Sequence, residues 1–240
     1  MIANSYRNSW DGYWSSLSGG PDEVFWDSAP AHAAALDLRN FGSFFDPSLP
    51  LVDFGCGNGT QTRFLADHFR TVVGLDVSPV AIQAAAASAP NLTYRVADIL
   101  DGGQAAALHA EMGDSNLYVR TVLHQLAPED QVAAASVLRL LMGSRGMVYL
   151  IELSSGAEPY FQSLIREYGM PPQLARVFEH NIHPGILDEN DVEKFFPASD
   201  YTTVAAGSSV IQTVHVLPTG EPARVPAFYR VIAARPQPDK

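Results

Sequence analysis

Apolar and polar residues alternate in blocks along the middle of the chain, from about residue 50 to residue 153. Short apolar runs bounded by turn residues predict buried strands near 51–54, 71–75, 92–96, 116–120 and 147–152. The longer runs between them repeat at helical spacing and predict helices near 61–69, 79–88, 102–111 and 128–142. Strands that alternate with helices predict a parallel sheet covered by helices on both faces.

The C-terminal part of the chain has a different pattern. Residues 201–216 and 228–234 are rich in β-branched residues, which favour strands. We expect these two runs to pair as an antiparallel hairpin at one edge of the sheet. The predicted fold is therefore α/β, with a doubly wound, Rossmann-like, mostly parallel seven-stranded sheet that ends in an antiparallel C-terminal hairpin.

Two aromatic-rich segments lie outside the alternating region. Residues 1–45 contain all three tryptophans of the chain and have the composition of a lid. Residues 154–200 combine aromatic residues, histidines and prolines, as insertions that shape a binding pocket often do. The expected single domain thus has a lid (1–45), a core (46–153), an insertion (154–200) and a hairpin (201–240). The side chains expected to line a substrate pocket are Trp10, Tyr13, Tyr160, Phe161, His180 and His183.

The composition is that of a globular protein and argues against several function classes. Acidic residues outnumber basic ones by 26 to 15, for a net charge of −11, and no basic cluster occurs. Nucleic acid is not an expected partner, because neutralising its phosphates requires clustered lysine and arginine. The apolar runs are too short to span a bilayer and the first residues do not resemble a signal peptide, so we expect no membrane partner and a cytoplasmic location. The single cysteine, Cys56, can form no internal disulfide.

A glycine loop follows the first predicted strand. The segment 51–60 reads as an apolar strand that breaks into Gly55, Gly57 and Gly59, with a helix expected directly after it. Glycines permit positive φ and carry no Cβ, so a ligand can approach the backbone there. The second apolar run ends in Asp76, and an acid at that position of such a unit accepts hydrogen bonds from a ribose. These residues predict a nucleoside-binding crevice.

The glycine spacing narrows the choice of nucleoside. A dinucleotide fingerprint has the spacing Gly-x-Gly-x-x-Gly, whereas this loop is one residue tighter. The tighter loop favours a ligand without a pyrophosphate. A third acid, Asp98, ends the third strand-like run, where it can accept a hydrogen bond from an adenine amine.

Four segments of this unit carry a resemblance to a known family. They are 52–59 around the glycine loop, 73–79 around Asp76, 96–98, and the fourth strand with its continuation, 116–124. In this order they resemble the class I S-adenosylmethionine-dependent methyltransferases, over roughly residues 50 to 153. The resemblance implies a methyltransferase with S-adenosyl-L-methionine as cofactor and S-adenosyl-L-homocysteine as product. It also makes the core the cofactor-binding part of the chain.

The resemblance further implies roles for individual residues. Asp53 and the loop 55–59 would hold the methionine part and the ribose side of the cofactor, and Asp76 would take the ribose hydroxyls. Asp98 would take the adenine amine, with Ala97 and Ile99 beside the adenine ring. The residues expected to bind the cofactor are Trp14, Trp26, Asp53, Gly55, Cys56, Gly57, Asn58, Gly59, Gln61, Asp76, Val77, Ala97, Asp98, Ile99 and Arg120.

Methyl transfer is an in-line displacement, for which positioning alone can lower the barrier by ~7–11 kcal/mol. Trp10, Trp14 and Trp26 either attract the sulfonium through their ring faces, by about 0.5–2 kcal/mol, or pack an N-terminal helix on the sheet. His124 follows the end of the fourth strand by one helical turn, and an imidazole with an ordinary pKa of ~6.5 can accept a hydroxyl proton. It is either the general base or a histidine bonded to backbone at a helix start.

Arg120 lies at the carboxyl end of the fourth strand, where the transferred methyl group is expected. It either binds a substrate carboxylate in a fork or pairs with an acid across the pocket. His180 and His183 could instead supply the base. No metal is expected, because proline and glycine follow His183 at once and no carboxylate cluster is near. The strand end lacks the Asn-Pro-Pro-Tyr motif found in amine and amide methyltransferases of the family, which argues against N-methylation of nucleic acid or protein.

The expected activity is methylation of a small molecule on oxygen, at a hydroxyl or carboxylate of an apolar or aromatic, natural-product-like acceptor. An alternative is transfer to sulfur, since Trp10, Trp14 and the run 25–27 resemble the start of thiol and thiopurine methyltransferases. Another is a cofactor-binding partner subunit without activity of its own. A nicotinamide oxidoreductase is disfavoured by the tight glycine loop and the lack of a Tyr-x-x-x-Lys pair. The expected oligomeric state is a monomer or a homodimer.

Overall fold

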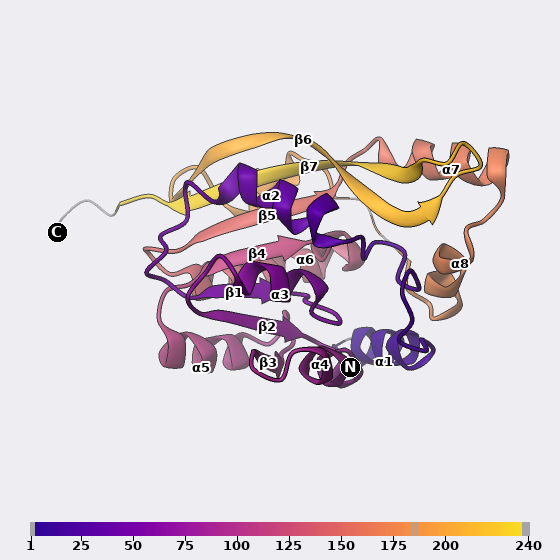
Figure 1. Ribbon diagram of the computed structural model, residues 1–240. Coiled ribbons are helices and arrows are strands. Elements are labelled where there is room, and N and C mark those ends of the chain that lie inside the picture. The colour runs from indigo at the N-terminus through magenta and orange to yellow at the C-terminus, as the bar shows by residue number, and fades with distance from the viewer. Residues whose placement is uncertain (1–2, 184, 186, 237–240) are drawn as a thin grey trace.

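A sheet of seven strands organises the chain (Figure 1). The structure is a computed structural model that describes residues 3–183, 185 and 187–236. Within these residues the strands lie in the order β3-β2-β1-β4-β5-β7-β6. The parallel strands are β1 (Leu51–Phe54), β2 (Val72–Asp76), β3 (Thr93–Val96), β4 (Asn116–Arg120) and β5 (Met147–Leu153). The strands β6 (Tyr201–Val216) and β7 (Pro222–Ala234) form an antiparallel hairpin, and β7 pairs antiparallel with β5.

This sheet confirms the fold predicted from the sequence, and most element boundaries agree closely. The strands β1 and β4 and the helices α4 (Pro79–Ser88) and α6 (Pro128–Met142) coincide with the predicted ranges. The ends of β2, β3, β5 and α5 (Gly102–Met112) differ from the predicted ones by one residue. The agreement follows from the alternating pattern, which is local in the chain.

Two elements differ more from their predicted ranges. The helix α3 (Thr60–Ala66) ends three residues before the predicted end at 69, because Asp67 and His68 donate to Phe64 and Leu65 in a tightened last turn. The strand β7 begins at Pro222 rather than 228. Its first residues pair with β6 alone, and a proline is tolerated where one side of a strand has no partner.

Capping residues fix where the helices begin. The Ser78 side chain accepts from the backbone N–H of Ala81 at the start of α4, and Pro79 occupies the first turn. Asp101 caps α5 in the same way. None of the helices in the described ranges is both long enough and apolar enough to cross a membrane.

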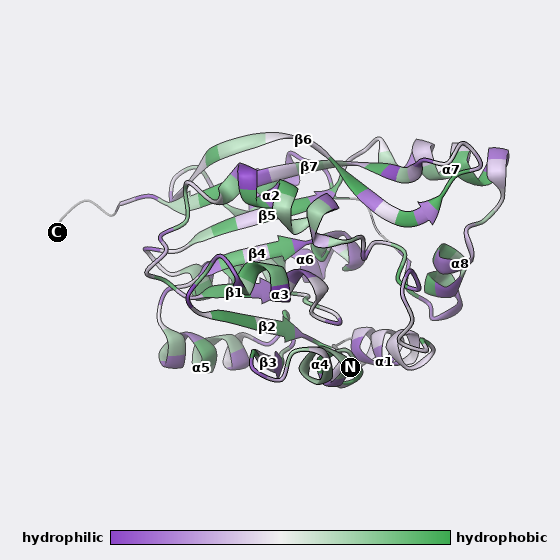
Figure 2. Ribbon diagram, in the orientation of Figure 1, coloured by the Kyte–Doolittle hydropathy of each residue, from purple (hydrophilic) through white to green (hydrophobic). Residues whose placement is uncertain are grey.

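Each face of the sheet has its own apolar core, because alternate side chains of a strand point to opposite faces. On one face Val52, Leu117 and Val148 pack against α5 and α6. On the other face Leu51 and Tyr118 pack against α3 and against α2 (Ala34–Phe41). Figure 2 shows the resulting apolar colouring of the central strands. Burial on both faces explains why these strands read as continuous apolar runs.

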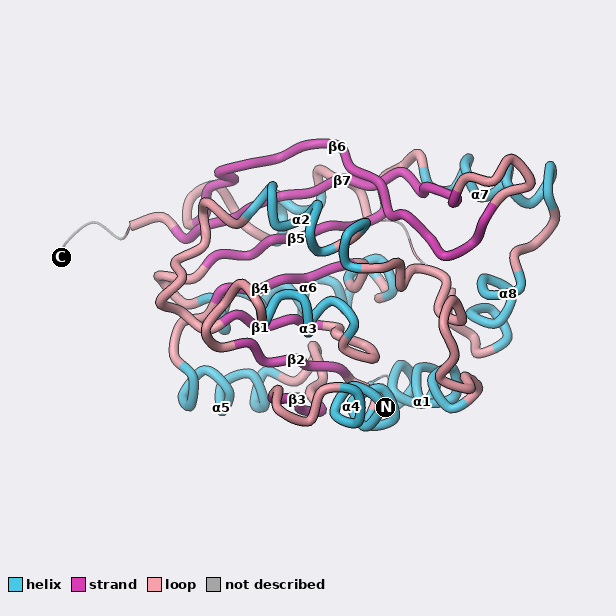
Figure 3. The backbone as a smooth tube through the Cα atoms, in the orientation of Figure 1, coloured by secondary structure: helices cyan, strands magenta, loops and turns pink. Residues whose placement is uncertain are grey.

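The two aromatic-rich segments meet at the end of the sheet where the parallel strands finish (Figures 1 and 3). The N-terminal segment contains α1 (Ala3–Ser15), the short η1 (Pro30–His32) and α2, and α1 packs beside α4. The insertion contains α7 (Ala157–Tyr168), α8 (Pro172–Glu179) and α9 (Asp191–Phe195). Side chains from both segments share one small core, which includes Tyr13, Trp14, Val24, Val177 and Ile182.

Candidate functional site

The loop after β1 has a backbone conformation that glycine adopts most easily. Gly55, Gly57 and Gly59 have φ values of 80°, 54° and 76°, in the left-handed region. A side chain would also lack space, since a Cβ on Gly57 would lie 2.8 Å from the ring of Trp14. A Cβ on Gly55 would lie 2.5 Å from the side chain of Val122. The bare loop therefore allows α1 to bring an indole ring directly onto its backbone.

Two buried acids stand next to this loop. Asp76 accepts from the backbone N–H groups of Gly57 and Ser78, both at 2.9 Å. Asp53, on the neighbouring strand, accepts from the Thr62 hydroxyl at 2.6 Å. Burial raises the pKa of Asp53 to about 7 and that of Asp76 to about 6, because the charged carboxylates lose hydration. A ligand with positive charge would favour the ionised form of both.

A third acid follows β3. Asp98 is partly exposed and accepts from the backbone N–H of Leu100 at 2.9 Å, while its own N–H donates to Gln104 at 3.1 Å. Its chain neighbours Ala97 and Ile99 are buried. The carboxylate is therefore held in place with its remaining lone pairs available.

These residues line one cleft at the carboxyl ends of the parallel strands. Its empty volume is about 1050 Å³, including solvent at its mouth. Gly59 is not part of the cleft wall, because it lies at the N-terminal cap of α3. Trp10, which was predicted for the substrate pocket, does line the cleft. The predicted cofactor residues on its wall are Trp14, Trp26, Asp53, Gly55, Cys56, Gly57, Asn58, Gln61, Asp76, Val77, Ala97, Asp98, Ile99 and Arg120.

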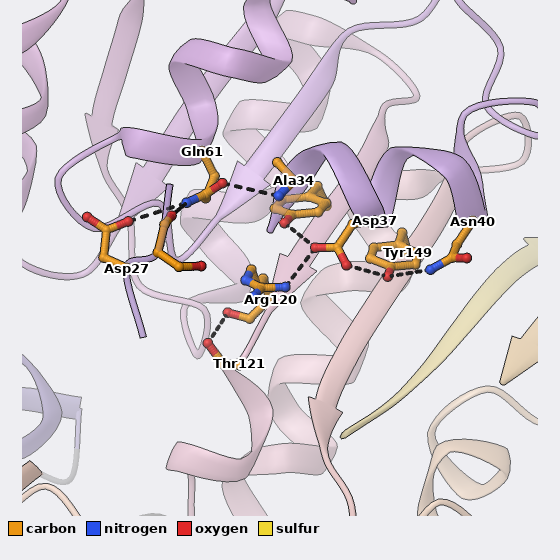
Figure 4. Close-up of polar contacts among 10 residues, drawn as sticks. Asp27, Ala34, Asp37, Asn40, Gln61, Arg120, Thr121 and Tyr149 are labelled. Carbon is orange, nitrogen blue, oxygen red and sulfur yellow. Dashed lines mark hydrogen bonds and ion pairs between the residues drawn. The ribbon is translucent and has the colours of Figure 1, made fainter. Parts of the chain in front are cut away.

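Asp27 joins the N-terminal segment to the glycine loop. Its carboxylate accepts from Asn58 Nδ2 and Thr60 Oγ1, both at 2.8 Å, and from Gln61 Nε2 at 3.3 Å. Gln61 also accepts from the backbone N–H of Ala34 at 3.2 Å (Figure 4). No separate role for Asp27 could be predicted from the sequence, because only its position after two aromatic residues marked it. The structure places it on the wall of the cleft.

Arg120 is held by a buried network (Figure 4). Its Nη1 donates to Asp37 at 2.7 Å, and the hydroxyls of Tyr118 and Tyr149 donate to the same carboxylate at 2.6 and 2.9 Å. Burial by itself would lower the pKa of Arg120, but the charge of Asp37 raises it above its ordinary value. The other terminal nitrogen, Nη2, is buried and has no hydrogen-bond partner within the described part of the chain. Of the two roles predicted for Arg120, pairing with an acid is thus observed, and one donor remains available at the cleft.

Comparison with known proteins agrees with this geometry. A family model described as a methyltransferase domain matches residues 51–146. The crystal structure of a SAM-dependent methyltransferase from Anabaena variabilis is 41% identical, with a TM-score of 0.90, over 98% of this chain and 96% of that chain. The chain belongs to the class I S-adenosylmethionine-dependent methyltransferases. The family that was predicted from the sequence is therefore confirmed, and so is the prediction that S-adenosylmethionine is the cofactor.

Two further relatives of this methyltransferase match over shorter stretches. An uncharacterized methyltransferase of Synechocystis is 31% identical over 119 residues, which cover 49% of this chain and 52% of the relative. A trans-aconitate 2-methyltransferase of Methylobacterium radiotolerans is 35% identical over 77 residues, or 31% of this chain and 27% of the relative. The present chain thus spans about half the length of the Synechocystis relative and about a quarter of the Methylobacterium relative.

His124 of the methyltransferase lies in η2 (Leu123–Gln125), directly after β4. It is buried and its Nδ1 is paired with the carboxylate of Glu152, which has no exposed surface. Glu152 also accepts from the backbone N–H groups of Val122, Leu123 and His124. These bonds fix the orientation of the imidazole ring against Glu152. The other ring nitrogen, Nε2, lies 2.8 Å from the side-chain amide nitrogen of Gln125.

Next to the cleft the methyltransferase has a second, smaller cavity with about 430 Å³ of empty volume, including solvent at its mouth. His124 lies on its wall rather than on that of the first cleft. The remaining lining is mostly apolar and comes from the N-terminal segment, the ends of β4 and β5, the insertion and the hairpin. The lining residues are Phe25, Trp26, Thr121, His124, Gln125, Leu153, Phe161, Leu174, Val177, Ile211 and Val225.

The other residues predicted for the substrate pocket are dispersed in the methyltransferase. Tyr13 is fully buried and stacks on Trp26, and His180 packs edge-on against Tyr13. The Tyr160 hydroxyl accepts from a backbone N–H of β7, and His183 stacks on Phe178. Phe161 reaches the second cavity. Over residues 3–183, 185 and 187–236, no group of three or more histidine, cysteine, aspartate or glutamate side chains could hold a metal ion.

We expect Gly57→Ala to weaken S-adenosylhomocysteine binding by about tenfold, since left-handed backbone strains alanine and the new methyl group meets the Trp14 ring. Gly113→Ala is the matched control, with φ of 74° and no atom within 4 Å of the added Cβ. It should show similar strain in a thermal melt but unchanged affinity. Calorimetric titration measures both, and equal affinities for the two variants would contradict the prediction.

Proposed function

We propose that this methyltransferase transfers a methyl group to an oxygen of a small, apolar or aromatic acceptor. When bound, S-adenosylmethionine supplies a methyl group on a positively charged sulfur, which an oxygen displaces in line to leave S-adenosylhomocysteine. The observation that carries the choice of oxygen is the Glu152–His124 pair at the wall next to the cleft. A hydroxyl must lose its proton in the transfer, and an imidazole oriented by a carboxylate is suited to accept it.

The charged residues of the cleft complement the charged groups of the cofactor. The cleft lining includes the acids Asp27, Asp53, Asp76 and Asp98, whereas Arg120 is the one lysine or arginine among its described lining residues and is already paired with Asp37. S-adenosylmethionine carries positive charge on its sulfonium and its ammonium group and negative charge on its carboxylate. The acids suit the two positive groups, and the unpartnered Nη2 of Arg120 suits the carboxylate.

The proposed roles of single residues follow the family pattern. The glycine loop and Asp53 take the methionine part, because a loop of glycines exposes backbone that a ligand can approach closely. Asp76 takes the ribose hydroxyls and Asp98 the adenine amine, with Ala97 and Ile99 at the ring. Both acids have lone pairs left for these bonds, because each of their oxygens accepts at most one bond within the protein.

The choice of a small acceptor is supported by the cover over the cleft. The helix α1 is anchored at two points, by the Tyr6 hydroxyl on Asp130 at 2.8 Å and by Asp11, which accepts from Ser78 at 2.5 Å. Trp10, between these anchors, and Trp14, beyond the second, line the cleft. We propose that residues 1–45 act as a lid that excludes water and large acceptors. Because residues of the same chain cover the cleft, the arrangement supports an active enzyme rather than a cofactor-binding partner subunit.

The proposed function is tested by calorimetric titration with S-adenosylmethionine, S-adenosylhomocysteine and NADH. We expect the two sulfur nucleosides to bind and NADH not to bind. A methyl-transfer assay against hydroxylated, carboxylated and thiol-bearing small molecules then identifies the accepting atom. Transfer to a protein or nucleic acid with none to small molecules would contradict the proposal.

Asp76→Ala should weaken cofactor binding by ~1.5–3 kcal/mol, or roughly 10- to 150-fold, because it removes hydrogen bonds to a charged acceptor. Asp67→Ala is the matched control, since it removes the same charge from an exposed position at the end of α3. Calorimetry at neutral pH compares the two variants with the parent protein. An affinity for Asp76→Ala equal to that of the control would show that Asp76 does not bind the cofactor.

A further inference from the structure

The second cavity and the cofactor cleft share a wall. Trp26, Thr121 and Gln125 line both of them, so these residues form the junction through which the two spaces adjoin. A methyl acceptor must place one atom next to the cofactor and the rest of its body elsewhere. The second cavity is the space that this junction offers for the body.

The junction carries backbone strain and an unsatisfied polar atom. Thr121 has a φ of 56°, which is uncommon for a β-branched residue and is typical of functional sites. The Oε1 atom of Gln125 is buried and has no hydrogen-bond donor among the residues that the structure describes. The side-chain amide nitrogen of Gln125 lies 2.8 Å from His124 Nε2, so Oε1 is on the side of the amide that faces away from His124. A buried acceptor without a donor is destabilising, so a ligand that donates there gains affinity.

The wall chemistry limits which ligand fits. The described lining of the second cavity contains no lysine, arginine, aspartate or glutamate, and its only titratable member is His124. A carboxylate would meet the oxygen of Gln125 without a cation to compensate it, and an ammonium group would meet no acid. Phe25, Trp26 and Phe161 on the wall favour contact with an aromatic ring.

We propose that the second cavity binds the methyl acceptor, and that the acceptor is an uncharged apolar molecule that donates one O–H or S–H bond to Gln125 Oε1. This inference rests on the proposed function and narrows it, since it disfavours the carboxylate acceptors that the sequence left open. Gln125 is then the residue that selects a protonated, neutral donor. His124, the one titratable side chain of the described lining, takes the proton that the acceptor loses.

The test uses the full chain saturated with S-adenosylhomocysteine and four probes: phenol, phenylmethanethiol, anisole and benzoate. Calorimetry should show phenol or phenylmethanethiol binding about tenfold more tightly than anisole and benzoate, which lack the donor or carry charge. A methyl-transfer assay with phenol and phenylmethanethiol tells an oxygen acceptor from a sulfur acceptor. Tight S-adenosylhomocysteine binding without this preference would overturn the cavity assignment and leave cofactor use standing. No S-adenosylhomocysteine binding by folded protein would overturn the proposed function as well.

Two variants test whether the probes bind in the second cavity. Gln125→Leu should weaken phenol binding by about tenfold, to the level of anisole, and leave anisole unchanged, whereas Gln162→Leu at an exposed site of α7 should change neither. Leu174→Phe, which fills the cavity from α8, should weaken both probes and leave S-adenosylhomocysteine affinity unchanged. Unchanged phenol binding in Gln125→Leu would overturn the role of Gln125 even if Leu174→Phe does not fold.

Discussion

The affinity for S-adenosylmethionine is expected to fall by about 100-fold between about pH 7.5 and about pH 5.5. The cause is the pair of buried acids at the glycine loop, because burial raises the pKa of Asp53 to about 7 and that of Asp76 to about 6. Both are ionised at the upper pH and attract the positively charged cofactor. At the lower pH both are mostly protonated in the ligand-free protein, and binding must release those protons. The affinity should therefore level off above the higher pKa and decrease steadily below it.

Calorimetry checks this expectation in two ways. The affinity is measured at several pH values, and the binding enthalpy near pH 6 is measured in buffers with different heats of ionisation, which reports the released protons. Asp76→Ala should show a shallower pH dependence, because one of the two titrating groups is gone. A flat profile for the parent protein would mean that the cofactor does not favour the ionised form of these acids.

The same acids have the opposite effect on folding without a ligand. Their pKa values in the folded protein lie above the ordinary value of 3.8, so the folded state binds protons that the unfolded state has already released. Their contribution to stability is present below about pH 4 and is lost as the pH rises toward 6 and 7. Bound cofactor should reduce this loss, because its positive charge favours the ionised acids.

Asp37→Asn is expected to destabilise the protein by about 3–5 kcal/mol, because it leaves the guanidinium of Arg120 buried without a counter-charge. Asp37 is 2% exposed and Arg120 is 9% exposed, so water cannot replace the lost partner. The change also weakens the acceptor for the hydroxyls of Tyr118 and Tyr149, whose rings are stacked 5.8 Å apart. The destabilisation is measured as the free energy of unfolding in urea at neutral pH.

A surface ion pair provides the control for this variant. Glu111→Gln removes a partner of Arg95 where both side chains are exposed, by 55% and 38%, and should change the free energy of unfolding far less than Asp37→Asn does. Combining Asp37→Asn with Arg120→Met should cost less than the sum of the single changes, since the double variant buries no unpaired charge. A loss for Asp37→Asn as small as that for Glu111→Gln would show that the network is not a buried ion pair.

The fold could be predicted because its signals are local. Each of the five parallel strands is an apolar run, and each helix between them repeats over a few turns, so no distant partner had to be known. The start of β7 was missed because Pro222 and Pro226 read as strand breakers. They are tolerated there because that stretch pairs with β6 alone, which depends on the sheet rather than on neighbouring residues.

The functional site likewise has residues that could be predicted from local sequence and residues that could not. The glycine loop and the three strand-end acids lie in short motifs, and all but Gly59 meet at the cleft. Asp27, Asp37 and Glu152 were missed because their partners lie 31, 83 and 28 positions away in the chain. The one sign of these residues in the sequence is a charged side chain at the end of an apolar run or inside it. Glu152, inside the apolar run 147–153, is an example. The helices α7 and α8 of the insertion are amphipathic, but such a pattern marks a buried face without telling which cavity that face lines, so the pocket residues could not be sorted by sequence.

Trp26 and Asp27 are neighbours in the chain, and together they join the two cavities. Trp26 lines both spaces, while Asp27 is bonded to the glycine loop through Asn58, Thr60 and Gln61. Movement of this dipeptide therefore cannot open one space without disturbing the other. In thermodynamic terms, we expect cofactor and acceptor to bind with positive cooperativity. Such coupling is reciprocal, so the factor by which the cofactor improves acceptor affinity equals the factor by which the acceptor improves cofactor affinity.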